Sequence, residues 1–152
     1  MAPAVAVGAI DADALDLAED LLDTMRASPA CVGLAAPQIG ISRRAFVVDV
    51  TGHRKAVSCH GPFVLFDPVV VASDAHVLAR EGCMSVPDLT GDVARATGLT
   101  VSGLGIDGER RTLRVDAFEA RAVLHEIDHL DGLLFLDRVV GPHAVFPRKT
   151  YR

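Results

Sequence analysis

The segment His125-Glu126-Ile127-Asp128-His129 constrains the fold more than any other part of this 152-residue chain. Residues four apart lie on one face of an α-helix, so His125 and His129 can offer two imidazole nitrogens to one tetrahedral metal ion. Glu126 then lies beside the ion and can accept a proton from a water molecule that the ion activates. The segment therefore predicts a helix that carries a mononuclear metal hydrolase site.

The residues around this segment predict a helix over positions 117–131. Asp116 and Glu119 have the spacing of a capping box, and Gly132 can adopt the left-handed conformation that ends helices. Much of the helix surface is apolar, which indicates a mostly buried helix. The apolar positions are Ala120, Val123, Leu124, Ile127 and Leu130.

A second helix is predicted near the start of the chain. Its apolar residues recur at helical spacing, and either Asp11 or Asp13 can cap its first turn, while Ser28-Pro29 can end it. The apolar residues are Leu15, Ala18, Leu21, Leu22 and Met25.

Short runs rich in β-branched residues predict strands at 44–50, 63–72, 99–106 and 110–115. Pro68 indicates an edge or a bulge in the second of these strands. Asp107-Gly108 between the last two favours a tight hairpin turn. Since strands and helices do not alternate regularly, the sequence predicts an α+β domain.

Composition and charge restrict the class of protein. The chain is 50% hydrophobic and 23% charged, which suits one compact domain over residues 1–152. A net charge of -5 disfavours binding to nucleic acid or to anionic membranes. The start has no secretory signal or transit peptide pattern and no long apolar run follows, so we expect a cytoplasmic protein. The odd number of cysteines (Cys31, Cys59 and Cys83) indicates reduced thiols.

Two further segments carry residues that suit a metal hydrolase. Cys83, between Gly82 and Ser85, can present a thiolate to an ion, although a lone cysteine is more often a small buried apolar residue. In the segment 33–40, small residues permit close backbone approach and the amide of Gln38 can donate to an oxygen. Taken alone, that segment is more often a turn with a solvent-facing glutamine.

Three motifs in this order resemble the signature motifs of the peptide deformylases: GLAAPQIG at 33–40, EGCMS at 81–85 and HEIDH at 125–129. Arg95 and the Asp107-Gly108 turn also fall where that family has an arginine and a hairpin, and the resemblance covers about residues 14–139. It implies an α+β fold in which antiparallel or mixed β-sheets surround a buried, metal-binding C-terminal helix.

The resemblance also implies a catalytic site. Cys83, His125 and His129 hold the metal, and Glu126 acts as general base and acid. The expected ion is Fe2+, with Zn2+, Ni2+ or Co2+ able to substitute, because a Cys-His-His set admits all four.

The implied reaction is removal of the N-formyl group from N-formylmethionyl peptides of newly made proteins. The metal, the Gln38 side chain and the Met84 backbone N–H meet the negative charge that develops on the formyl oxygen. Substrate contacts are expected from Val32, Gly33 and Leu34 along the peptide backbone, and from Phe118, Ala122 and His125 around the methionine side chain.

Three positions depart from the family pattern: Leu124 stands where glutamine is usual, Cys31 where glycine is, and Thr90 where many members have arginine. The short flanks at both ends lead us to expect weaker action on nascent chains, with at most a transient ribosome contact. The alternatives are a deformylase or amidase that acts on a formylated small molecule, and a non-catalytic metal-binding protein of this fold. A general endopeptidase is less favoured, because no clear third ligand follows His129.

The sequence supports four further expectations about individual polar residues. Asp128 could orient an imidazole or form a surface salt bridge. Glu81 is expected to form a hydrogen bond near the site, and Cys31 to be an inert packed thiol. A second metal site is not expected among the remaining cysteine and histidines, namely His53, His60, His76, His143 and Cys59.

Overall fold

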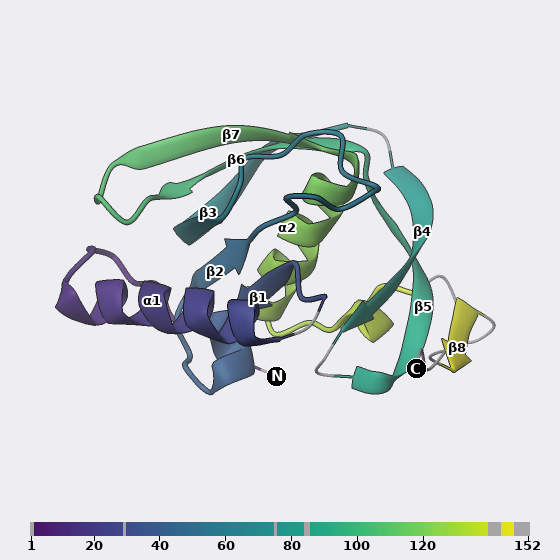
Figure 1. The fold of residues 1–152 in the computed structure, drawn as a ribbon, viewed down its shortest axis with the longest axis horizontal. Helices are drawn as coiled ribbons and strands as arrows, with labels where there is room; N and C mark the ends of the chain where they lie inside the picture. Colours follow the sequence, from purple (N-terminus) through teal and green to yellow (C-terminus); the bar gives the residue numbers. More distant parts are fainter. Residues whose placement is uncertain (1, 29, 75, 84–85, 140–143, 148–152) are drawn as a thin grey trace.

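The computed structural model describes residues 2–28, 30–74, 76–83, 86–139 and 144–147. Two antiparallel sheets and two α-helices form most of the molecule (Figure 1). The larger sheet has the order β1 (Gly33–Ala35), β2 (Ala45–Val48), β3 (Phe63–Ser73), β6 (Gly98–Leu104), β7 (Arg110–Asp116). The smaller sheet has the order β4 (His76–Cys83), β5 (Val86–Ala96), β8 (Val145–Pro147). The two 3-10 helices are η1 (Ala36–Ile39) and η2 (Phe135–Asp137).

Helix α1 (Ala12–Ala27) begins and ends where the sequence predicts. The side chain of Asp11 accepts a hydrogen bond from the Ala14 N–H at 2.9 Å, and Ser28 is the C-terminal cap. Its buried face is Ala14, Leu17, Ala18, Leu21 and Met25. Placing Leu15 on that face was wrong: Leu15 is 46% exposed, because Ala14 and Leu17 occupy the first turn of the buried stripe.

Strand β2 is buried on both sides, as its continuous apolar run suggests. Alternate residues of a strand face opposite sides of a sheet. Ala45 and Val47 pack in the cluster that contains α1, whereas Phe46 and Val48 pack in the cluster that contains the second helix. The two helices therefore cover opposite faces of the larger sheet.

Helix α2 (Ala117–Leu130) runs through the middle of the molecule and contacts strands of both sheets (Figure 1). Gly132 follows it with φ +80°, as predicted. The predicted capping box is wrong, because Asp116 makes no side-chain cap bond and Glu119 binds loop residues instead. No helix in the described part of the chain is long and apolar enough to span a bilayer.

The predicted hairpin is confirmed as β6 and β7, with Gly108 at φ +79°. Its turn is wider than a two-residue loop, since Leu104 pairs with Arg110. In β3 the register shifts between Phe66 and Val69, so the proline between them lies at a bulge of an internal strand. The α+β class is confirmed, with antiparallel pairing in both sheets, whereas β1, β4, β5 and β8 were not predicted as strands.

Candidate metal centre

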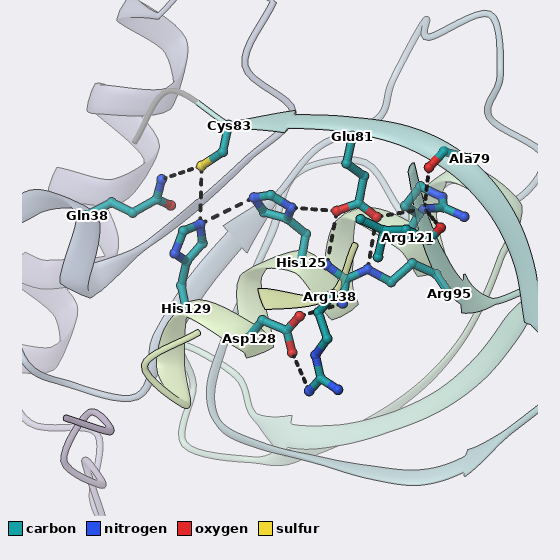
Figure 2. A network of polar contacts seen from close by, with 11 residues as sticks. Gln38, Ala79, Glu81, Cys83, Arg95, Arg121, His125, Asp128, His129 and Arg138 are labelled. Atoms are coloured by element: carbon teal, nitrogen blue, oxygen red, sulfur yellow. Dashed lines mark hydrogen bonds and ion pairs between the residues drawn. The ribbon is translucent and has the colours of Figure 1, made fainter. Parts of the chain in front are cut away.

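Three donor atoms from two distant segments converge beside α2. The Sγ atom of Cys83 comes from the end of β4, and two imidazole nitrogens come from His125 and His129. All three lie within 4.8 Å of one another. His129 Nε2 is 3.3 Å from Cys83 Sγ and 3.3 Å from His125 Nε2 (Figure 2). Because bonds of about 2.0–2.3 Å to a tetrahedral ion separate ligands by about 3.3–3.7 Å, the arrangement fits one divalent ion.

The end of β4 determines where the thiol lies. The pairing of β4 with β5 shifts register between Gly82 and Cys83, so the strand is irregular at the residue that carries the thiol. Cys83 is buried and packs with Val93 and Phe135. The thiol therefore sits in a fixed pocket beside the two histidines rather than on the surface.

Glu81 fixes the orientation of His125. Its Oε1 lies 2.9 Å from His125 Nδ1, and its two oxygens also accept hydrogen bonds from Arg95 (2.9 and 3.0 Å) and Arg121 (2.7 Å) (Figure 2). Burial raises the pKa of Glu81, but the hydrogen bonds from His125 and Arg95 outweigh it and hold the pKa at about 2. An ionised Glu81 accepts a hydrogen bond from Nδ1, which leaves the lone pair of Nε2 for an ion.

The surroundings of His125 favour a positive charge. Burial lowers its pKa, but hydrogen bonds to Cys83 and Glu81 prevail and raise the pKa to about 10. A divalent ion at Nε2 would take the place of the proton that this anionic environment stabilises. One thiolate and two imidazoles form a donor set that suits a transition ion.

Asp128 matches neither of the two roles considered from the sequence. It is buried and forms ion pairs with Arg95 and with Arg138, the latter at 3.2 Å. It therefore does not form a simple surface salt bridge, and it accepts hydrogen bonds from the two arginines rather than from an imidazole. Asp128 holds Arg95, which in turn holds Glu81 (Figure 2).

Glu126 is a buried carboxylate beside the donor atoms. It is 4% exposed, and Oε1 has no hydrogen-bond partner among the described residues. Burial raises the pKa of Glu126 to about 7, although the nearby charges of His125 and His129 act in the opposite direction. Its Oε2 lies so close to Gly33 that a Cβ atom there would be 2.6 Å away. Such a group can accept and release a proton near neutral pH.

A cavity of about 380 Å³ opens at this centre. Gln38 lines it, and its amide is oriented: Oε1 accepts a hydrogen bond from the Ala35 N–H at 2.9 Å, while Nε2 points to Cys83 Sγ at 3.4 Å. The amide N–H groups therefore face the place where the ligands converge. Met84, expected to supply a backbone donor, lies outside the described residues.

The cavity includes most of the substrate contacts expected from the sequence. Val32, Gly33, Phe118 and Ala122 line it together with His125. The side chain of Leu34 does not, because it is fully buried in the core beneath α1.

The positions that depart from the family pattern divide between the cavity and the core. Cys31 and Thr90 line the cavity. Cys31 also packs against the core beneath α1, as expected, and burial raises the pKa of its thiol. Leu124 packs against the hydrophobic core instead. His53 also lines the cavity and was missed, because a single histidine in a polar loop carries no periodicity or spacing that would reveal it.

Comparison with known proteins agrees with this geometry. The family model for polypeptide deformylases matches residues 2–144. A peptide deformylase of Halothermothrix orenii is 44% identical over 126 residues, which cover 83% of this chain and 77% of that protein. The crystal structure of the Ehrlichia chaffeensis enzyme superposes with a TM-score of 0.86 at 28% identity, covering 93% of this chain and 82% of that one. The crystal structure of the Synechococcus elongatus peptide deformylase in complex with actinonin superposes with a TM-score of 0.82 at 34% identity. The match covers 93% of this chain and 73% of that one. The chain therefore belongs to the peptide deformylase family of metal-dependent hydrolases, which remove the N-formyl group.

Proposed function

We propose that this chain hydrolyses the N-formyl group of formylmethionyl peptides at one divalent ion held by Cys83, His125 and His129. The observation that carries the proposal is the convergence of these three donor atoms within 4.8 Å at a cavity that Gln38 and Glu126 also line. A soft thiolate and two imidazoles leave one position of a tetrahedral ion for a water molecule or a substrate oxygen.

Two polar side chains of the cavity and one backbone N–H have roles in the proposed reaction. When bound, the ion lowers the pKa of a water molecule and polarises the formyl carbonyl. Glu126 accepts the proton of the attacking water and passes it to the departing amine, which its pKa of about 7 permits. The amide of Gln38 donates to the oxygen on which negative charge develops, and the backbone N–H of Met84 is the second proposed donor.

The substrate peptide is proposed to lie between two edge strands. β1 ends the larger sheet and β4 ends the smaller one, and the cavity is lined by Gly33 from the former and by residues 80–83 from the latter. An extended peptide can pair with such a free edge, here through the backbone at Val32, Gly33 and Leu34. Phe118 and Ala122 then contact the methionine side chain. The Synechococcus elongatus enzyme binds actinonin, and we expect actinonin to occupy this cavity.

We propose Fe2+ as the physiological ion. Protein purified without oxygen and loaded in parallel with Fe2+, Zn2+, Ni2+ or Co2+ should be most active with Fe2+ and should lose that activity in air, because iron beside a thiolate is readily oxidised. Higher anaerobic activity with Zn2+ than with Fe2+ would contradict this assignment.

We also propose where and how the enzyme acts. The metal ligands come from β4 and α2, which belong to different parts of the chain, so we expect residues 1–152 to act as one catalytic domain. Because the proposed substrate is newly made protein, we propose that the enzyme acts in the cytoplasm and contacts the ribosome transiently.

A formate-release assay tests the proposed function. The metal-loaded protein should deformylate formyl-Met-Ala-Ser, and Glu126→Gln should keep the metal while turnover falls by about 10²-fold or more. Formylated amines form a second arm of the assay. Turnover of the amines with every formyl peptide left untouched would support the small-molecule alternative. No turnover of either substrate by fully loaded protein would support a non-catalytic metal-binding protein.

A further inference from the structure

The loop between β2 and β3 is fastened to α2 by a buried carboxylate. Glu119 is fully buried, and its Oε1 accepts a hydrogen bond from Ser58 Oγ at 2.7 Å. Its Oε2 accepts one from the His60 backbone N–H at 2.8 Å, and the His60 ring nitrogen Nδ1 lies 2.7 Å from Oε1. Ser58 Oγ in turn accepts from the Asp116 N–H at 2.8 Å. Burying a carboxylate is unfavourable unless it is hydrogen-bonded, so these contacts tie the loop to the first turn of the helix.

The same turn of α2 supports a second residue of this loop. The ring of His53 stacks on Phe118, with a centroid separation of 3.9 Å and an interplanar angle of 7°. Phe118 directly precedes Glu119 in the chain. The start of the helix therefore holds the loop through Glu119 and through a backbone bridge between Ala56 and Ala117, and Phe118 stacks on the His53 ring.

The stacked rings form part of the wall of the catalytic cavity. His53 and Phe118 both line it, together with Ala122, His125 and Glu126. The ring of His53 is also oriented within its loop, because its Nδ1 accepts a hydrogen bond from the Lys55 backbone N–H at 3.1 Å. In the neutral ring the proton is then on Nε2.

We propose that His53 contacts the first side chain of the substrate and contributes to its selection, and that Glu119 is a residue that positions His53. The inference rests on the proposed function and deepens it. The rings of His53 and Phe118 together offer two aromatic surfaces to a long, unbranched side chain. A methionine sulfur makes favourable contacts with the edges of such rings. A short side chain such as that of alanine does not reach the rings.

Steady-state kinetics with two substrates test the contact. His53→Ala should raise KM for formyl-Met-Ala-Ser by about 5- to 10-fold, with kcat changed by less than about twofold, because His53 does not touch the donor atoms. KM for formyl-Ala-Ala-Ser should stay unchanged. His53→Phe keeps a stacked ring and should restore most of the selectivity. As a matched control, Val57→Ala alters a loop side chain that is 78% exposed and should change neither constant.

The positioning role is tested by a double-mutant cycle. Glu119→Gln should raise KM for the methionine substrate, and adding it to His53→Ala should raise KM no further. Ser58→Ala removes one of the contacts while the carboxylate remains, so it gives a milder version of the same effect if Glu119→Gln fails to fold. Additive effects in the double variant would overturn the positioning role. An unchanged preference for methionine over alanine in His53→Ala would overturn the contact itself.

Binding separates this inference from the proposed function. Calorimetry with formyl-Met-Ala-Ser and metal-loaded Glu126→Gln protein needs no turnover. The Glu126→Gln protein is compared with a variant that carries both Glu126→Gln and His53→Ala. Tighter binding of the peptide by the former supports the contact, even if the wild-type protein fails to release formate. Equal binding, with an active wild-type enzyme, overturns the contact alone.

Discussion

Glu126→Gln should stabilise the metal-free protein although it lowers turnover by about 10²-fold or more. Glu126 has an ordinary pKa of 4.5 in the unfolded chain and a pKa of about 7 in the folded one, where burial disfavours its charge. Since one pH unit corresponds to about 1.4 kcal/mol, the ionised carboxylate costs about 3 kcal/mol of folding free energy at pH 7 and above. Glutamine has nearly the same shape and carries no charge.

The pH dependence follows from the direction of this change. Below pH 4.5 the carboxyl is protonated in both states and costs nothing. Between pH 4.5 and 7 the folded state binds more protons than the unfolded state, so wild-type stability falls as pH rises. The advantage of Glu126→Gln should therefore grow from less than about 1 kcal/mol at pH 5 to about 3 kcal/mol at pH 8.

Urea unfolding of chelator-treated wild-type and variant protein at the two pH values measures this difference. Glu19→Gln, which neutralises an exposed carboxylate on α1, is the matched control and should show no such trend. A loaded metal ion should reduce the advantage, because its positive charge stabilises an ionised Glu126. An equal effect of Glu126→Gln at pH 5 and pH 8 would refute the reasoning.

Three other substitutions probe the centre. Cys83→Ser should lose the bound metal in elemental analysis, whereas Cys59→Ser, at an exposed cysteine, should keep it. Glu81→Gln should lower metal affinity by about 10- to 100-fold in competition titrations. It should also destabilise the protein by about 3–5 kcal/mol at pH 7, because it weakens the pairing of two buried arginines. Because the folded pKa of Glu81 is about 2, that stability difference should shrink as pH falls from 4.5 toward 2. Gly33→Ala should displace Glu126 and lower kcat by about 10²-fold with the circular dichroism spectrum retained; unchanged kcat would contradict the close packing.

Much of the site could be predicted because most of its chemical groups belong to short sequence motifs. The helical spacing of His125 and His129 is a local property, and so is the position of Glu126 between them. The resemblance of three motifs added Cys83 and Gln38, which lie far away in the chain. The burial of α2 also followed from its apolar positions, and α1 followed from its cap at Asp11.

The errors arise where long-range contacts override a local pattern. Glu119 has capping-box spacing, but Ser58 and His60 satisfy its carboxylate instead. Strands β4 and β5 were missed because charged and small residues interrupt their alternation, and pairing with each other supplies their stability. Cys31 packs against the core as expected, but its second position, in the wall of the cavity, depends on the fold and could not be predicted.

The sequence by itself determined which atoms could bind and move charge, since residue type and helical spacing set the chemistry of His125, Glu126 and His129. Only the tertiary structure decided the pKa values and the orientations of those groups. The pKa of about 7 at Glu126 comes from burial against Gly33, and the orientation of His125 comes from Glu81. Both depend on packing between segments that are far apart in the chain, and desolvation and hydrogen-bond geometry are properties of that packing.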